Sequence, residues 1–204
     1  ALTPYRQAGV LASQTGPTGA PAVIQDIGAP DQRQHANYVR RLMDGGGFPV
    51  LKPGSADLYE TYQSHQPPAY YVLAAGWAKL TGADPTSASG WRLRWLSALL
   101  GLATLLGVYF CGAWGLGKPE VGLAAAAFAG LMPMFLALHG AVSNDPLLFA
   151  LCTWTLALLG LWVRSPNSGW RTPAAIGVLT GLALLTKTSA IALAPAIAVA
   201  LAFA

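Results

Sequence analysis

Residues Leu93–Trp114 read LRWLSALLGLATLLGVYFCGAW, an apolar run of 22 residues that contains a single charged side chain, Arg94. A helix rises about 1.5 Å per residue, so about 20 such residues cross the roughly 30 Å hydrocarbon core of a bilayer. This stretch therefore predicts a transmembrane helix, and the rest of the chain is interpreted around it.

Further apolar stretches follow it, at Val121–Val142, at Pro146–Val163 and from Ala174 to the end, where Lys187 and Pro195 interrupt the pattern. The connections are short, so neighbouring spans should be antiparallel and adjacent. Pro195 is expected to break or kink the last stretch, because an interior proline removes a helix hydrogen bond. The fold class predicted for residues 93–204 is all-α, a polytopic membrane helix bundle of about four to five spans.

Composition supports a membrane protein. The chain has 204 residues, of which 12 are Lys or Arg and 8 are Asp or Glu, and 54% are hydrophobic. Soluble domains carry roughly 25% charged residues, far more than the 10% found here. Between Trp95 and Val163 only Lys118, Glu120 and Asp145 are charged. The net charge of +4 is dispersed, without the basic run that nucleic-acid binding requires.

The polar first part of the chain divides at Pro30. Residues 1–30 show no helical or strand period and are predicted to form an extended arm. Residues 31–92 are predicted to form an outer-face loop with two short amphipathic helices, Asp31–Met43 and Ala69–Leu80, and with residues 48–64 as a connecting loop. The chain lacks an initial Met and ends inside an apolar run, so we expect it to be a piece of a longer protein.

Ionisable groups at membrane depth are costly and are functional candidates for that reason. Asp145 precedes Pro146 at the head of a predicted span, and a helix N-cap explains it as well as a functional role does. Lys187 lies among the hydroxyls of Thr186, Thr188 and Ser189, either as a lysine reaching toward the interface or in a polar pocket. Gly177 and Gly181 have the spacing that lets helices approach closely.

Four segments of this chain, in this order, resemble motifs of the membrane-embedded glycosyltransferases of the GT-C superfold. This group contains the protein O-mannosyltransferases and the aminoarabinose transferases of lipid A. Pro30-Asp31-Gln-x-x-His35 is similar to its "PDE-x-x-H" motif, and Ser64–Tyr71 (SHQPPAYY) to "HQPPLYY". Ser143–Pro146 (SNDP) is similar to its "ND" loop, and Gly181–Thr188 (GLALLTKT) to "GLALLTKY".

The resemblance implies a lipid-linked, polyprenyl-phosphate sugar donor and transfer at the outer face of the membrane. By the same match, Asp31 would be the catalytic general base. The residues implied in substrate binding are His35, His65, Gln66, Asn144, Asp145 and Lys187. Among these, His65 and Gln66 would line the sugar-phosphate site, and Lys187 would neutralise the lipid phosphate. Gln32 stands where the family usually has a second acid, so no metal ligands are predicted, although a divalent cation stays open as a cofactor.

Two functions follow as alternatives. The first is an enzyme that transfers a sugar from a polyprenyl-phosphate donor to an acceptor. The second is a non-catalytic GT-C-like structural subunit of a larger membrane complex, whose partners would be other membrane subunits. Both readings expect an integral protein of the inner or plasma membrane, in contact with membrane lipids, with residues 31–92 on the outer face.

Overall fold

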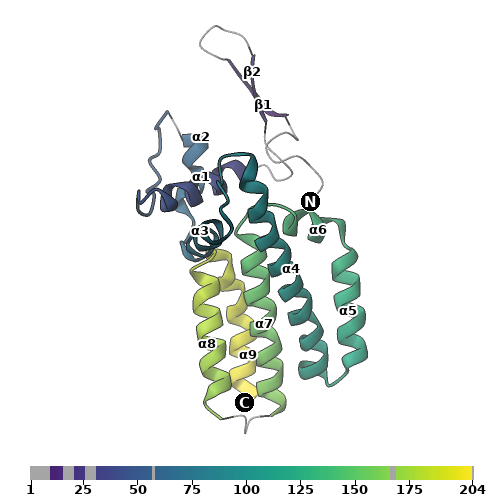
Figure 1. The fold of residues 1–204 in the computed structure, drawn as a ribbon. Coiled ribbons are helices and arrows are strands. Elements are labelled where there is room, and N and C mark those ends of the chain that lie inside the picture. The colour runs from purple at the N-terminus through teal and green to yellow at the C-terminus, as the bar shows by residue number, and fades with distance from the viewer. Residues whose placement is uncertain (1–9, 16–20, 26–30, 57, 166–168, 204) are drawn as a thin grey trace. The chain divides into compact units, whose positions relative to one another are not determined.

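The fold was analysed in a computed structural model that describes residues 10–15, 21–25, 31–56, 58–165 and 169–203 (Figure 1). The chain divides into two compact units. The first unit comprises residues 1–65, 71–97 and 137–143, and the second comprises residues 66–70, 98–136 and 144–204. Each unit is described by itself.

Within the N-terminal arm, β1 (Val10–Thr15) and β2 (Pro21–Gln25) pair as an antiparallel two-stranded sheet. The sequence analysis predicted no regular element here, because neither stretch alternates polar and apolar residues. Hydrogen bonding between two strands depends on the backbone, so a hairpin can form without that alternation. The other residues of the arm lie outside the described residues.

The two helices predicted within residues 31–92 form close to where the sequence places them. Helix α1 (Gln32–Met43) begins after Asp31 and buries His35, Tyr38 and Val39, which share one helical face. Helix α3 (Ala69–Thr81) follows Pro67 and Pro68. The stretch 48–64, predicted as loop, contains α2 (Leu58–Thr61) and most of the 3₁₀ turn η1 (Tyr62–His65). One-turn elements are too short to show a helical period.

The second unit contains most of the apolar helices. After the 3₁₀ turn η2 (Ala88–Arg92), α4 (Leu93–Phe110) continues into a π-helical turn, η3 (Cys111–Leu116). The elements that follow are α5 (Pro119–Leu131), α6 (Pro133–His139), α7 (Asp145–Arg164), α8 (Arg171–Leu184), the 3₁₀ turn η4 (Thr188–Leu193) and α9 (Ala194–Phe203). Helix α7 packs against η3, α8 and α9 (Figure 1).

The all-α helix bundle predicted from the sequence is confirmed. By length and composition, two helices among the described residues can cross a membrane, Ser89–Leu116 and Asp145–Arg164. The number rises to three if α5 and α6 together form one span. Helix α8 and the stretch Thr188–Phe203 are shorter apolar helices.

The second predicted span is not one straight helix. Helices α5 and α6 are bent by 72° at Met132, where the backbone is extended (φ −69°, ψ 124°). Pro133 explains the break, because its ring disfavours a helical conformation of the preceding residue and it has no N–H to donate. The apolar composition of Val121–Val142 concealed this bend.

Of the two interruptions predicted in the last apolar stretch, the structure has the one at Lys187 and not the one at Pro195. Helix α8 ends at Leu184, and Lys187 is extended (φ −159°, ψ 135°). Pro195 is the second residue of α9 and does not interrupt it. A proline is tolerated in the first turn of a helix because the N–H groups there have no partner within the helix.

Close helix approach occurs at glycines other than Gly177 and Gly181. A Cβ at either of those two positions would meet no atom within 4 Å. In contrast, a Cβ on Gly112 of η3 would collide with the backbone of Gly122 in α5, and a Cβ on Gly160 would collide with Gly115. Glycine therefore permits backbone contact between the second unit's helices at these two places.

We predict that Gly112→Ala destabilises the protein by about 1 to 3 kcal/mol, the usual cost of forcing extra volume into a packed interior. The atoms it would displace belong to the backbone of Gly122, which cannot move aside as a side chain could. Gly177→Ala is the matched control and should be neutral or stabilising, because alanine is the better helix former. Thermal unfolding of both variants in the same detergent checks this, and equal melting temperatures would contradict it.

Candidate active site

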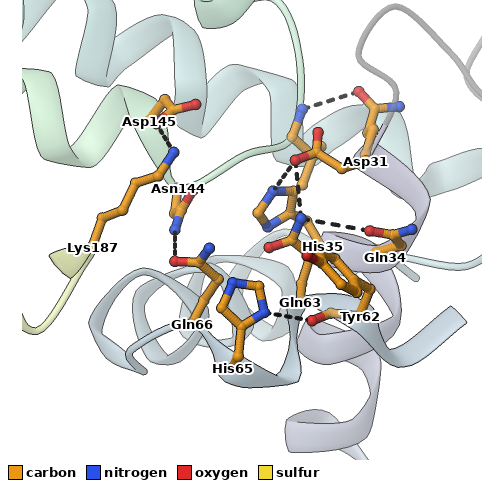
Figure 2. A network of polar contacts seen from close by, with 12 residues as sticks. Asp31, Gln34, His35, Tyr62, Gln63, His65, Gln66, Asn144, Asp145 and Lys187 are labelled. Carbon is orange, nitrogen blue, oxygen red and sulfur yellow. Dashed lines mark hydrogen bonds and ion pairs between the residues drawn. The ribbon is translucent and has the colours of Figure 1, made fainter. Parts of the chain in front are cut away.

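In the first unit, the carboxylate of Asp31 is held at the start of α1 by two neighbours. Its Oδ2 lies 3.2 Å from Nε2 of His35 and accepts a hydrogen bond of 3.0 Å from Nε2 of Gln63 (Figure 2). The other ring nitrogen of His35, Nδ1, lies 2.8 Å from the hydroxyl of Tyr71. Asp31, His35 and Tyr71 therefore form a row from carboxylate to imidazole to phenol.

The hydrogen bonds indicate which atoms of this row carry protons. A neutral imidazole has one N–H and one acceptor nitrogen. Since an ionised Asp31 can only accept, Nε2 of His35 donates to it, and Nδ1 accepts from the hydroxyl of Tyr71.

Exposure differs sharply along the row. The side chain of His35 is 2% exposed, whereas that of Asp31 is 43% exposed. Tyr71 is buried, and its ring stacks on that of Tyr38 with centroids 3.6 Å apart. Burial also raises the pKa of the Tyr38 phenol above its ordinary value. A substrate can therefore reach Asp31 but not the imidazole that orients it.

Gln32 occupies the position where the motif that this chain resembles has a second acid. Its side chain is buried, at 1% exposure, and its Oε1 accepts a hydrogen bond of 3.0 Å from the N–H of Val142. Among the described residues no group of three or more His, Cys, Asp and Glu side chains could hold a metal ion. The amide of Gln32 is neutral and its Oε1 is already engaged by the N–H of Val142, so Gln32 does not supply a ligand for a divalent-cation site at Asp31.

Ion pairs fix the remainder of α1. Arg33 pairs with Glu60 at 2.5 Å, and Asn37 donates to the same carboxylate at 2.8 Å. Arg40 pairs with Asp44 and, at 3.1 Å, with Asp84. The pKa of Asp84 lies below its ordinary value, chiefly because its carboxylate accepts a hydrogen bond from the backbone N–H of Thr86. Desolvation opposes this shift, and hydrogen bonds from the Thr86 side chain and from Arg40 add to it. These contacts tie α1 to α2 and to the loop after α3.

In the second unit, three of the segments that resemble family motifs meet. Nδ2 of Asn144 lies 3.3 Å from Oε1 of Gln66 and 3.2 Å from the carbonyl oxygen of Thr186 (Figure 2). The N–H of Ala69 donates to the carbonyl of Leu185 at 2.9 Å. Asn144 is buried at 1% exposure, so its amide is a structural link between residues 66 and 186 as well as a candidate binding group.

Lys187 and Asp145 form the charged part of this second cluster. Nζ of Lys187 lies 2.6 Å from Oδ1 of Asp145, and the two side chains are 30% and 24% exposed. Asn144, not Asp145, occupies the N-cap position of α7, so the sequence-based alternative of Asp145 as the cap is not what the structure has. The lysine is held by a carboxylate at the break between α8 and η4.

His65 is placed differently from the other predicted residues. Its ring is exposed and packs edge-on against Tyr62, and Nδ1 lies 2.6 Å from the Tyr62 carbonyl oxygen. Because a carbonyl can only accept, Nδ1 of His65 carries a proton. Sequence reasoning did not find Gln63, which contacts Asp31 from 32 positions along the chain. No motif marks Gln63, since its role depends on the position of η1.

The apolar helices of this chain are long enough, by length and composition, for a membrane protein. A family model described as dolichyl-phosphate-mannose-protein mannosyltransferase matches residues 65–204, more than half of the chain. The chain therefore belongs to this family of glycosyltransferases, and the resemblance found in the sequence is confirmed. The matched region includes His65, Gln66, Asn144, Asp145 and Lys187, while Asp31 and His35 precede it. No curated protein and no solved structure matches the chain.

Proposed function

We propose that this protein transfers a sugar from a polyprenyl-phosphate donor to an acceptor hydroxyl at the outer face of the membrane. The observation that carries the proposal is the Asp31 carboxylate, held by buried or part-buried neighbours yet reachable from solvent. Family membership supplies the reaction class. Residues 31–92, with α1 and α3, form the outer-face loop in this proposal.

Asp31 acts as the general base. The acceptor oxygen forms a bond to the anomeric carbon while the bond from that carbon to the donor phosphate oxygen breaks, and the acceptor proton passes to Asp31. Positioned acid–base catalysis contributes about 10² to 10⁴ in rate. His35, Tyr71 and Gln63 are positioning residues, because they contact Asp31 or its partner and orient the carboxylate.

Lys187 stabilises the leaving polyprenyl phosphate. Negative charge develops on the phosphate as the bond breaks, and a cation that is already in place lowers the energy of that state. Asp145 holds the ammonium group at 2.6 Å, which restricts a flexible side chain. By the family resemblance, His65 and Gln66 would line the sugar-phosphate site. Within the second unit, Asn144 keeps Gln66 in place through the bond of 3.3 Å.

The test is transfer by the full chain reconstituted in lipid. Polyprenyl-phosphate mannose and nucleotide-linked mannose are compared as donors, with hydroxyl-bearing peptides and lipids as acceptors. We expect labelled sugar to be transferred from the lipid-linked donor and not from the nucleotide. Absence of transfer from the lipid-linked donor across the acceptor panel would favour the alternative function, a non-catalytic subunit of a membrane complex.

A further inference from the structure

The first unit contains a basic pocket. Its lining includes none of Asp31, His35, Gln63 and Tyr71. A cavity of about 300 Å³ is lined by Arg41, Lys52, Thr61, Ser64 and the apolar Phe48 and Val50, among others. It shares Arg41, Thr61 and Ser64 with a neighbouring cavity of about 160 Å³. The larger volume lies at the lower end of the range for small-molecule sites, roughly 300 to 1,000 Å³.

The charges of this pocket are not balanced within the protein. Across the part of the chain that the structure describes, Arg33, Arg40 and Lys187 each pair with a carboxylate, whereas neither Arg41 nor Lys52 does so. Glu60, which lines the smaller cavity, is already engaged by Arg33 and Asn37. The two cations therefore face a shared space without a counter-ion from the described residues.

Arg41 is pre-positioned by the glycine turn that ends α1. Its Nε donates to the carbonyl of Gly47 at 3.3 Å, which leaves the terminal guanidinium nitrogens for another acceptor. Gly45 and Gly47 have positive φ values of 75° and 67°, a conformation that glycine adopts without strain. A Cβ on Gly46 would lie 3.0 Å from Cγ of Arg41, so the absence of a side chain there makes room for the arginine.

We propose that this pocket binds a phosphate group of the acceptor. A phosphate carries about −1.5 to −2 charge at pH 7 and several acceptor oxygens, which match two cations and the adjoining hydroxyls. Phe48 and Val50, both exposed, provide apolar contacts for the group to which the phosphate is attached. That the pocket binds a phosphate group does not depend on the proposed function. That this phosphate belongs to the acceptor of sugar transfer does rest on it.

The pocket is connected to the general base within the same unit. Gln34 lines the smaller cavity and lies 3.5 Å from Nε2 of Gln63, which donates to Asp31. An acceptor anchored by its phosphate at Arg41 and Lys52 would extend along α1 toward that carboxylate. Arg41 follows Asp31 by ten residues, or about 15 Å along the helix. The pocket would then select acceptors whose phosphate lies roughly that far from the reacting hydroxyl.

Binding of phenyl phosphate and inorganic phosphate to the full chain in phosphatidylcholine nanodiscs, followed by ³¹P NMR, tests this site. We expect saturable binding that Lys52→Gln weakens about tenfold, the loss of roughly one charge-assisted contact. Lys79→Gln, which removes an exposed lysine of α3 outside this pocket, should leave the affinity unchanged. Gly46→Ala keeps every charge and should still weaken binding several-fold by displacing Arg41.

Equal weakening by Lys52→Gln and Lys79→Gln, or no saturable binding, would overturn the proposal. Asp31→Asn separates it from the proposed function, because that variant should lose transfer and keep phosphate binding. The source of the phosphate is identified by repeating the measurement in nanodiscs that contain phosphatidic acid. If phosphatidic acid weakens the binding of phenyl phosphate, the pocket takes a phosphate carried by a lipid. If the binding of phenyl phosphate is unchanged, the pocket takes the phosphate of a soluble acceptor.

Discussion

We expect Asp31→Asn to lower the turnover number for sugar transfer by about 10² to 10⁴, the contribution of a positioned general base. Asparagine preserves the size of the side chain and can still accept a hydrogen bond from Gln63, but it cannot take the acceptor proton. The KM for the lipid-linked donor should change little, because the proposed role of Asp31 is to act on the acceptor hydroxyl. Steady-state transfer from polyprenyl-phosphate mannose measures both quantities.

The matched control is Asp44→Asn, which removes a carboxylate at the other end of the same helix. Asp44 pairs with Arg40 on the surface and has no part in the proposed chemistry. An exposed ion pair is worth about 0 to 1 kcal/mol, so this variant should transfer sugar at close to the normal rate. Equal losses in the two variants, or full activity of Asp31→Asn, would rule out the assignment of the base.

Lys187→Gln should lower kcat/KM for the lipid-linked donor by about 10² to 10³, as removal of a group that stabilises developing negative charge does in other enzymes. Lys187→Gln also affects Asp145, because the carboxylate of Asp145 loses its partner at 2.6 Å. A loss of activity could then come from a disturbed start of α7 instead of from the phosphate.

A double-mutant cycle distinguishes these two explanations. In the double variant Lys187→Gln with Asp145→Asn, neither position is charged and no unpaired carboxylate remains. If Lys187 binds the donor phosphate, the double variant stays as inactive as Lys187→Gln. Recovery of activity in the double variant would show that Lys187 serves only to pair with Asp145, and the phosphate role would be withdrawn.

Local sequence patterns predicted helices α1 and α3 well. The face of α1 that buries His35, Tyr38 and Val39 follows from their helical spacing, and the entry of α3 follows from Pro67 and Pro68. Both features depend on neighbours within a few residues, and such information is present in the sequence itself. The resemblance to a glycosyltransferase family also came from the sequence, and the family match confirmed it.

The breaks in the apolar stretches were harder to predict. Pro133 bends α5 against α6 and Pro195 leaves α9 intact, although both are prolines in apolar surroundings. Both prolines lie in the first turn of a helix, Pro133 in α6 and Pro195 in α9. They differ in what precedes them, a helix that bends by 72° in the first case and the 3₁₀ turn η4 in the second, and this depends on how the helices pack. For the same reason, Gly112 and Gly122 make a close contact while the regularly spaced Gly177 and Gly181 make none.

The composition and the lengths of the apolar runs are sufficient to establish a helical membrane protein, because hydrocarbon accepts only backbones whose hydrogen bonds are made internally. They do not identify the partners of the reactive groups. Tyr71 reaches His35 from 36 positions away, Gln63 reaches Asp31 from 32, and Lys187 reaches Asp145 from 42. Hydrogen bonds form only over about 3 Å, so packing of helices and turns decided each of these contacts.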